Sequence, residues 1–284
     1  MTLTRMIWKG NGMKYFGLAI AAVTLIVSCA SSGSKGDTAV QKEPFDSTYA
    51  AWAGVLQSFI HGELVDYGGL KAKRAGLDST IRQLAGLSAD RFKTMSRDEQ
   101  MALWINAYNA ITLRSIVDAY PVSSIKEING VWDKKKWLVA GREVTLNEIE
   151  HKILRPEFKD PRVHFAVNCA SIGCPPLKPK PFAAETLDQQ LSDAASTFVN
   201  HPTRNKFNSS DGTITSSEIF SWFAEDFLPF GNDQTLPSLS KEETAVFNFI
   251  RSLANDSLAA SLDSRRQWSL AYAPYDWSLN DTAN

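Results

Sequence analysis

The pattern of apolar and polar residues predicts a helix-rich domain. Apolar side chains recur at the spacing of an α-helix over residues 46–60. Ser96 and Glu99 form a capping box that opens a long helix, and Pro121 marks its end. The same periodicity and capping patterns predict the remaining helices, at residues 145–154, 185–198, 217–227 and 241–253.

Short extended segments alternate with these helices. Two pairs of them flank the turn sequences Gly141-Arg142 and Asp211-Gly212, and both pairs predict hairpins. Residues 163–167 form a short apolar run that predicts a strand, and residues 268–272 are expected to close a sheet. The mixture predicts an α+β fold, a helix-rich single domain with hairpins and a small mixed or antiparallel sheet.

The first residues follow a different pattern. Lys14 precedes an apolar run from Gly17 to Val27, which is shorter than the roughly 20 residues that span a bilayer and is typical of a signal peptide. The run ends in Ile26-Val27-Ser28-Cys29, which resembles the lipobox of bacterial lipoproteins. We expect cleavage before Cys29 and attachment of lipid to this residue.

These patterns divide the chain into three parts. Residues 1–28 are interpreted as the signal peptide, with Met13 as the expected true start, residues 29–44 as a lipidated, flexible tether, and residues 45–284 as the globular domain. Acyl chains on Cys29 would anchor the protein stably in a membrane. By resemblance to Gram-negative lipoproteins, the expected location is the outer membrane of the cell envelope, facing the periplasm.

Composition narrows the class of partner. The chain of 284 residues has 30 Lys and Arg against 31 Asp and Glu, a net charge of -1. This balance gives no electrostatic footprint for nucleic acid, so no nucleic-acid partner is expected, and no cofactor is predicted. Hydrophobic residues make up 44% of the chain, enough for a sizeable core.

Several motifs point to one family. They are Trp104–Ala110, Ile149-Glu150, His164–Ser171 with Cys174–Leu177, Phe220-Ser221-Trp222 with Asp226-Phe227, and Tyr275–Asn280. Together they resemble the family called domain of unknown function 547, from about Val65 to Asn280. The family has no generally assigned activity, and some members are fused to glutaredoxin-like or regulatory domains. The resemblance therefore implies kinship and leaves the mechanism open.

The long helix carries polar residues on an otherwise apolar surface. It is apolar on nearly every side and is therefore predicted to be buried. Asn106 and Asn109 are neighbours on one side of it, and Arg114 falls near the same side. A buried amide without partners costs about 1–3 kcal/mol. The asparagines therefore either tie loop backbone to the helix or line a functional pocket, and the sequence favours neither interpretation.

The helix that begins at Thr145 positions a carboxylate. Its apolar stripe places Glu150 inward and His151 on the opposite, solvated side. A buried carboxylate needs a cation or several N–H donors. Arg114 and Arg162 are the candidate structural partners of Glu150, and His164 is the candidate functional partner.

With Cys29 assigned to lipid, Cys169 and Cys174 remain. Two nearby cysteines in an exported domain favour a structural or redox disulfide. Alternatively, Cys169 is a nucleophile with His164 as its base. A metal site lacks an evident fourth ligand, so no metal is predicted. If residues 163–167 are a straight strand, His164 and Cys169 point to opposite faces, and the loop must turn Cys169 back.

The leading function hypothesis is a thiol-dependent enzyme for acyl transfer or amide hydrolysis on a peptide or cell-wall substrate. Cys169 would be the nucleophile, His164 the base, and Glu150 or Asn106 the group that orients the imidazole. The alternative is a non-catalytic lipoprotein that binds a ligand or an envelope partner, with a structural Cys169–Cys174 disulfide. The residues expected to build the site are Cys169, His164, Glu150, Asn106, Asn109, Arg114 and, at the rim, Cys174.

Overall fold

Helix α5 (Arg97–Ala119) is the longest element of the computed structural model, which describes residues 41–231, 236–264 and 267–283. The predicted capping box opens it: Glu99 N donates to Ser96 Oγ (3.2 Å), and Ser96 N donates to Glu99 Oε2 (2.6 Å). Most of its residues between Met101 and Val117 are buried, as predicted from its apolar surface.

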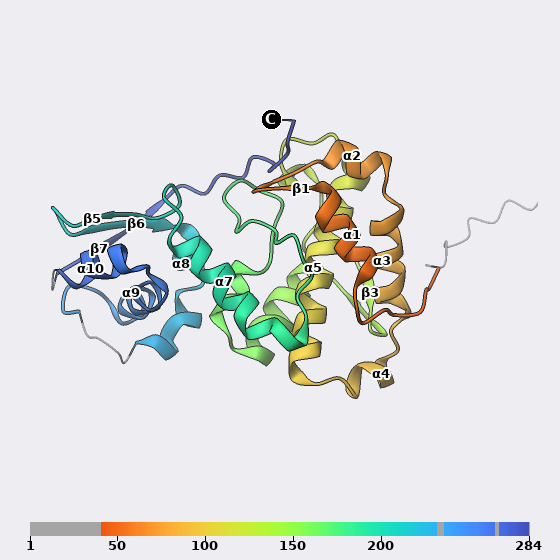
Figure 1. Ribbon diagram of the computed structural model, residues 1–284, viewed down its shortest axis with the longest axis horizontal. Coiled ribbons are helices and arrows are strands. Elements are labelled where there is room, and N and C mark those ends of the chain that lie inside the picture. Colours follow the sequence, from red (N-terminus) through yellow and green to blue (C-terminus); the bar gives the residue numbers. More distant parts are fainter. Residues whose placement is uncertain (1–40, 232–235, 265–266, 284) are drawn as a thin grey trace, which may run out of the picture. The chain divides into compact units, whose positions relative to one another are not determined.

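Helices and one hairpin surround α5 and form a first apolar cluster. Helix α3 (Ala75–Gly86) packs against both α1 (Ala50–Phe59) and α5, and α2 (Tyr67–Ala72) also contacts α5. All four helices lie in the same part of the molecule (Figure 1). The predicted hairpin of β3 (Trp137–Val139) and β4 (Arg142–Val144) packs against α3.

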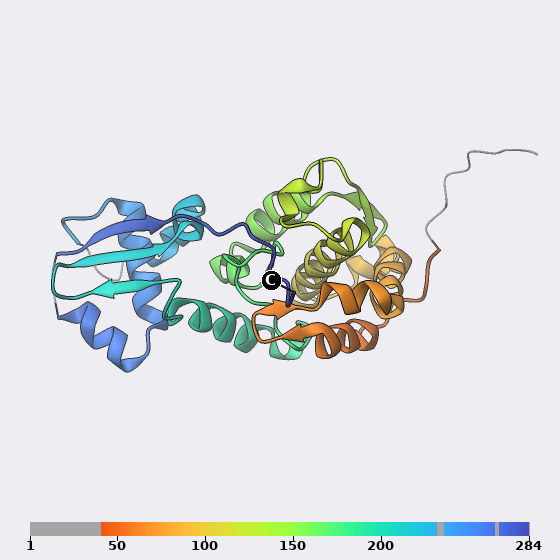
Figure 2. The same cartoon turned by 90° about the horizontal axis from the view of Figure 1, so that it is seen from above.

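A second apolar cluster lies against a three-stranded sheet. Strand β6 (Thr213–Ser217) pairs antiparallel with β5 (Lys206–Asn208) and parallel with β7 (Ser269–Ala273). Helices α9 (Lys241–Leu253) and α10 (Asp256–Asp263) lie on one face of this sheet (Figures 1 and 2). Phenylalanine rings fill the cluster, among them Phe165, Phe198, Phe220, Phe227 and Phe249. The helices together with the small sheets confirm the α+β class and the single helix-rich domain.

The remaining elements are short, apart from α7, which contacts α9 and the 3-10 helix η3 (Pro161–Phe165). Their bounds are β1 (Ile60–His61), β2 (Leu64–Val65), α4 (Ala89–Lys93), η1 (Ile125–Glu127), η4 (Ala184–Thr186), α7 (Leu187–Val199), α8 (Glu218–Trp222) and the 3-10 helix η5 (Ala224–Phe230).

The helix predicted from Thr145 extends further than the sequence indicates. Its capping box with Glu148 is present, and α6 (Leu146–Glu148) continues directly as the π-helix η2 (Ile149–Phe158). The helical segment therefore runs past Leu154, through Pro156.

The strand predicted at residues 163–167 is wrong. Pro161–Phe165 form the 3-10 helix η3, and Asp160 caps it by accepting a hydrogen bond from Arg162 N (3.0 Å). Proline suits the first position of a helix because its missing N–H would have no partner there. Because there is no strand at these residues, the expectation that His164 and Cys169 lie on opposite faces of one is also wrong.

The predicted signal peptide, Cys29 and most of the tether lie outside the described residues. The described residues belong to one compact unit. Across the described ranges, no helix has the length and apolar character needed to cross a membrane.

Candidate functional site

A pocket of about 230 Å³ is lined by residues from both apolar clusters and from the segments that join them. Cys169, Cys174, His164 and Glu150 all line it, so four of the predicted site residues share one cavity. Aromatic rings make up much of the rest of the wall, namely Tyr108, Trp132, Trp222, Phe223, Tyr275 and Trp277.

Cys169 and Cys174 form a disulfide in the wall of this pocket. Tyr275 OH lies 3.0 Å from Cys174 Sγ and 3.3 Å from Cys169 Sγ, and Ser171 Oγ lies 3.3 Å from each sulfur. The Cys169 backbone N–H donates to Cys174 Sγ (2.9 Å). Burial raises the pKa of Tyr275 against the opposing effect of its hydrogen bond with Ser171, so the phenol keeps its proton.

Two buried asparagines hold the loop that carries the cysteines. Asn109 Oδ1 accepts from Asn168 N (2.8 Å), and Asn109 Nδ2 donates to Ala166 O (2.9 Å). Asn168 Oδ1 accepts from Ala170 N (2.8 Å), and its Nδ2 donates to Pro175 O (2.8 Å). Asn109 thus ties loop backbone to α5, and it positions the disulfide loop without lining the pocket.

His164 pairs with a carboxylate from the second cluster. The ring is 3% exposed and stacks on Phe223, with centroids 3.9 Å apart. His164 Nε2 lies 2.7 Å from Asp226 Oδ2, to which Arg155 Nε also donates (2.6 Å). Burial opposes ionisation of Asp226, yet the hydrogen bonds from His164 and Arg155 hold the pKa of its carboxyl well below the ordinary value.

An ionised Asp226 fixes the proton on the imidazole. Because the carboxylate can only accept, Nε2 of His164 carries the hydrogen. In the neutral ring Nδ1 is then a free lone pair, and it is buried without a hydrogen-bond partner among the described residues. The arrangement is that of a base oriented by a carboxylate.

Glu150 is half-buried rather than fully buried, and its partner is a tyrosine. Tyr108 OH donates to Glu150 Oε2 (2.9 Å). Burial raises the pKa of Tyr108, and the charge of the nearby Glu150 raises it further. The phenol therefore keeps its proton and remains a hydrogen-bond donor. No ion pair between the described residues includes Glu150. The prediction of a cationic partner for Glu150 is thus wrong. His151 is exposed, as predicted.

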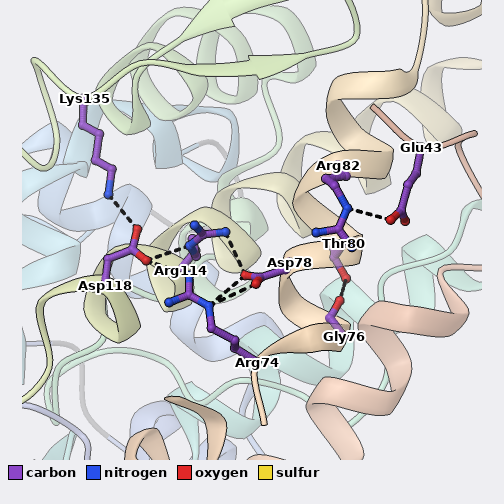
Figure 3. A network of polar contacts seen from close by, with 9 residues as sticks. All are labelled: Glu43, Arg74, Gly76, Asp78, Thr80, Arg82, Arg114, Asp118 and Lys135. Atoms are coloured by element: carbon purple, nitrogen blue, oxygen red, sulfur yellow. Dashed lines mark hydrogen bonds and ion pairs between the residues drawn. The ribbon is translucent and has the colours of Figure 1, made fainter. Parts of the chain in front are cut away.

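Both arginines considered for Glu150 are paired elsewhere. Arg114 binds Asp78 (2.9 Å) and Asp118 (2.8 Å), in a surface network with Arg74 and Lys135 (Figure 3). Arg162 pairs with the Asp160 and Asp188 carboxylates. Arg114 does not line the pocket. At 100° per residue it is turned about 80° from Asn106 and about 140° from Asn109, towards Asp78 of α3.

Asn106 is also outside the pocket. Its Nδ2 donates to Phe182 O (2.8 Å), and its Oδ1 accepts from Phe182 N (3.0 Å). Both ends of the amide are used to fix one backbone residue, so the structural interpretation holds for Asn106. The prediction that it joins Cys169, His164 and Glu150 around one pocket is wrong.

Sequence reasoning missed Asp226, Arg155 and Tyr275 as parts of the site. Asp226 and Tyr275 stand in motifs that carry the family resemblance, which was the available indication. Their roles depend on contacts with residues far away in sequence, such as Asp226 with His164. Within the part of the chain that the structure describes, no group of three or more His, Cys, Asp or Glu residues could hold a metal ion.

Comparison with known proteins supports the family. Residues 92–199 match the family model described as protein of unknown function, DUF547. The match includes Glu150, His164 and both pocket cysteines, and it ends before Asp226 and Tyr275. No curated protein and no solved structure matches the chain.

Proposed function

We propose that this DUF547 domain is the ligand-binding part of a lipid-anchored envelope protein, and that its ligand is a peptide or a cell-wall fragment. The observation that carries the proposal is the pocket, whose wall combines aromatic rings with a carboxylate that forms no ion pair with any described residue. Cavities with mostly apolar walls and a few converging polar groups are the usual binding sites of proteins.

The aromatic wall offers faces for a flat or extended ligand. Trp222 is 44% exposed, and its ring centroid lies 4.9 Å from that of Tyr275, which in turn lies 4.7 Å from that of Trp277. Exposed aromatic rings bury large areas on contact and lose few rotatable bonds. A peptide backbone or a sugar ring could stack against them.

The polar end of the pocket suits a ligand with N–H groups. Glu150 accepts one hydrogen bond, from Tyr108, and a carboxylate has capacity for more. Amide or ammonium groups of the ligand would fill this capacity. A half-buried carboxylate gains more from such a donor than an exposed one, because water screens it less.

Binding to the full chain in detergent micelles, measured by calorimetry with defined cell-wall peptides and glycan fragments, tests the proposal. Trp222→Ala should weaken binding roughly tenfold or more, as is typical of a central aromatic contact. Trp137→Ala, on hairpin β3–β4 away from the pocket, is the matched control and should leave affinity unchanged. Equal affinity of both variants, or no binding of any fragment, would contradict the proposal.

The lipid anchor is a separate part of this proposal. It rests on the lipobox-like Ile26–Cys29 and on the short apolar run before it. Lipid on Cys29 would hold the domain at a membrane, and the outer membrane facing the periplasm is the proposed site. Peptides and cell-wall fragments are both present in the periplasm.

A second candidate function, acyl transfer or amide hydrolysis by reduced Cys169, is favoured by His164, which lines the same pocket and pairs with Asp226 behind it. The Cys169 thiol would pass its proton to His164 as sulfur attacks the carbonyl carbon, and the leaving amine would take that proton. Water would then release the acyl group. The hydrogen bonds of the described residues include none between His164 and Cys169.

Mass spectrometry of candidate amides incubated with the full chain tests the second candidate. Cleavage should require reduction of the disulfide and should persist in Cys174→Ser, which leaves Cys169 free. It should disappear in Cys169→Ser and in His164→Gln. Cleavage by the oxidised chain, or none by Cys174→Ser, would rule out the mechanism.

A further inference from the structure

The two sulfurs of the pocket disulfide are not equivalent. Both cysteines line the pocket, but Cys169 is half-buried whereas Cys174 is 3% exposed. An incoming group in the pocket therefore meets the sulfur of Cys169 more readily than that of Cys174. Thiol–disulfide exchange depends on which sulfur can be attacked and on how well the other one leaves.

Hydrogen-bond donors surround the sulfur that would leave. Cys174 Sγ has the Cys169 N–H at 2.9 Å, Tyr275 OH at 3.0 Å and Ser171 Oγ at 3.3 Å. Neutral disulfide sulfur is a weak acceptor, and a thiolate is a strong one, because hydrogen bonds to charged groups are roughly twice as strong as those between neutral groups. The Cys169 N–H and the Tyr275 hydroxyl therefore favour a thiolate on Cys174 over the closed disulfide, and Ser171 supports them by donating to Tyr275 OH (3.2 Å).

The loop is held in place without help from the disulfide. Besides the two hydrogen bonds of Asn168, Ile172 N donates to Ser278 O (2.9 Å) and Gly173 N donates to Asp276 O (2.9 Å). Ala170, with φ of 62°, is fixed between them. The sequence separation of the cysteines is only 5, so the bond constrains the unfolded chain less than one that closes a long loop.

We propose that the pocket disulfide is a thiol–disulfide exchange centre, in which a thiol-bearing ligand attacks Cys169 and Cys174 leaves. The thiolate of the ligand forms a bond to Cys169 Sγ, the Cys169–Cys174 bond breaks, and its electron pair goes to Cys174 as thiolate. The thiolate of a second thiol of the same ligand then attacks the ligand sulfur of the mixed disulfide, the bond from that sulfur to Cys169 breaks, and its electron pair goes to Cys169 as thiolate. The ligand dithiol loses two electrons and two protons and becomes a disulfide, and both cysteines are reduced.

The exchange goes beyond ligand binding and does not depend on the peptide or cell-wall ligand proposed above. It also differs from amide hydrolysis, because here the ligand supplies the nucleophile and Cys169 is the sulfur under attack. Tyr275 acts directly on the leaving sulfur, so its hydroxyl is the group to remove.

The first experiment follows the reaction of the oxidised full chain with glutathione at neutral pH, with acid quenching and mass mapping of each cysteine. We expect glutathione on Cys169, with Cys174 free. Tyr275→Phe should slow the reaction roughly tenfold, as expected for one lost hydrogen bond to a charged group. Tyr272→Phe, on strand β7 and without a contact to either sulfur, should react at the rate of the unchanged protein.

The second experiment measures the pH dependence of alkylation of Cys174 in Cys169→Ala. Burial alone would raise the pKa of this thiol above the ordinary value of about 8.5, and hydrogen bonds from the backbone N–H of residue 169 and from Tyr275 OH should bring it below. Tyr275→Phe should raise it again.

The proposal fails if glutathione adds to Cys174, or if the folded chain does not react at all under conditions in which the unfolded chain does. It also fails if Tyr275→Phe and Tyr272→Phe react at equal rates, or if Cys174 titrates at or above about 8.5.

Discussion

The contacts of Asp226 with His164 and Arg155 offer the most direct test of how the two apolar clusters are held together. Its carboxylate accepts from Arg155 Nε (2.6 Å), Arg155 Nη2 (3.1 Å) and His164 Nε2 (2.7 Å), and the side chain is 26% exposed. Asp226→Asn keeps the shape and one acceptor but removes the charge and turns one oxygen into a donor that faces other donors.

The expected cost follows from these contacts. Hydrogen bonds to a charged group contribute about 1.5–3 kcal/mol each, and breaking a fully buried ion pair costs about 3–5 kcal/mol. Because Asp226 is partly exposed and asparagine retains one acceptor, Asp226→Asn should lower the free energy of unfolding by about 3 kcal/mol. Asp90→Asn, which breaks the exposed pair with Lys93, should cost less than about 1 kcal/mol.

The sign of the pH dependence is fixed as well. The pKa of Asp226 is lower in the fold than the value of about 3.9 in an unfolded chain. Its contribution is therefore fully present above about pH 4 and is lost as the pH falls towards the folded value. The difference between the unchanged protein and Asp226→Asn should shrink by about 1 kcal/mol between pH 7 and pH 3.

Urea unfolding of both variants, followed by tryptophan fluorescence at pH 7 and pH 3, measures these quantities. A loss for Asp226→Asn no larger than that for Asp90→Asn would show that the carboxylate does not join the clusters. A difference that stays constant or grows at pH 3 would refute the electrostatic part of the reasoning.

Three further predictions concern single positions. Asn106→Ala should lower the free energy of unfolding by about 2–3 kcal/mol in urea titrations, because both backbone groups of Phe182 lose a buried partner, while ligand affinity stays unchanged. Glu150→Ala should lower the free energy of unfolding several times more than His151→Ala in the same assay. Equal losses would mean that the hydrogen bond between Tyr108 and Glu150 contributes little to stability. Cys29→Ser should abolish incorporation of labelled palmitate, and undiminished labelling would disprove lipidation at this residue.

Periodicity and capping predicted much of the fold because they are local. The helix from Ser96, the second capping box at Thr145 and the hairpin turn at Gly141 each depend on residues within a few positions of one another. The segment at residues 163–167 failed because a short apolar run does not distinguish a strand from a helical turn. The Asp160-Pro161 pair before it was the better indication of a helix start.

The candidate site was predictable in part for a related reason. At 100° per residue, Arg114 points about 80° away from Asn106 and about 140° away from Asn109, and it lies about 12 Å beyond Asn106 along the axis at 1.5 Å per residue. The prediction that it joins the asparagines therefore misjudged both its direction and its height. Its partner Asp78 comes from another helix, and Asp226 reaches His164 from 62 residues away. Such pairs are set by tertiary packing and have no local pattern.

The pocket has walls from both apolar clusters, with Tyr108 and Trp277 packed in the first and Phe223 and Tyr275 in the second. A ligand in this pocket would contact both clusters, so its binding energy would add to the stability of their packing. At a ligand concentration 100 times the Kd, this linkage is worth about 2.7 kcal/mol. When the pocket is occupied, amide hydrogens on α5 and on α8 should both exchange more slowly than in the ligand-free protein. A ligand in one small cavity would thus reduce local opening in both parts of the domain.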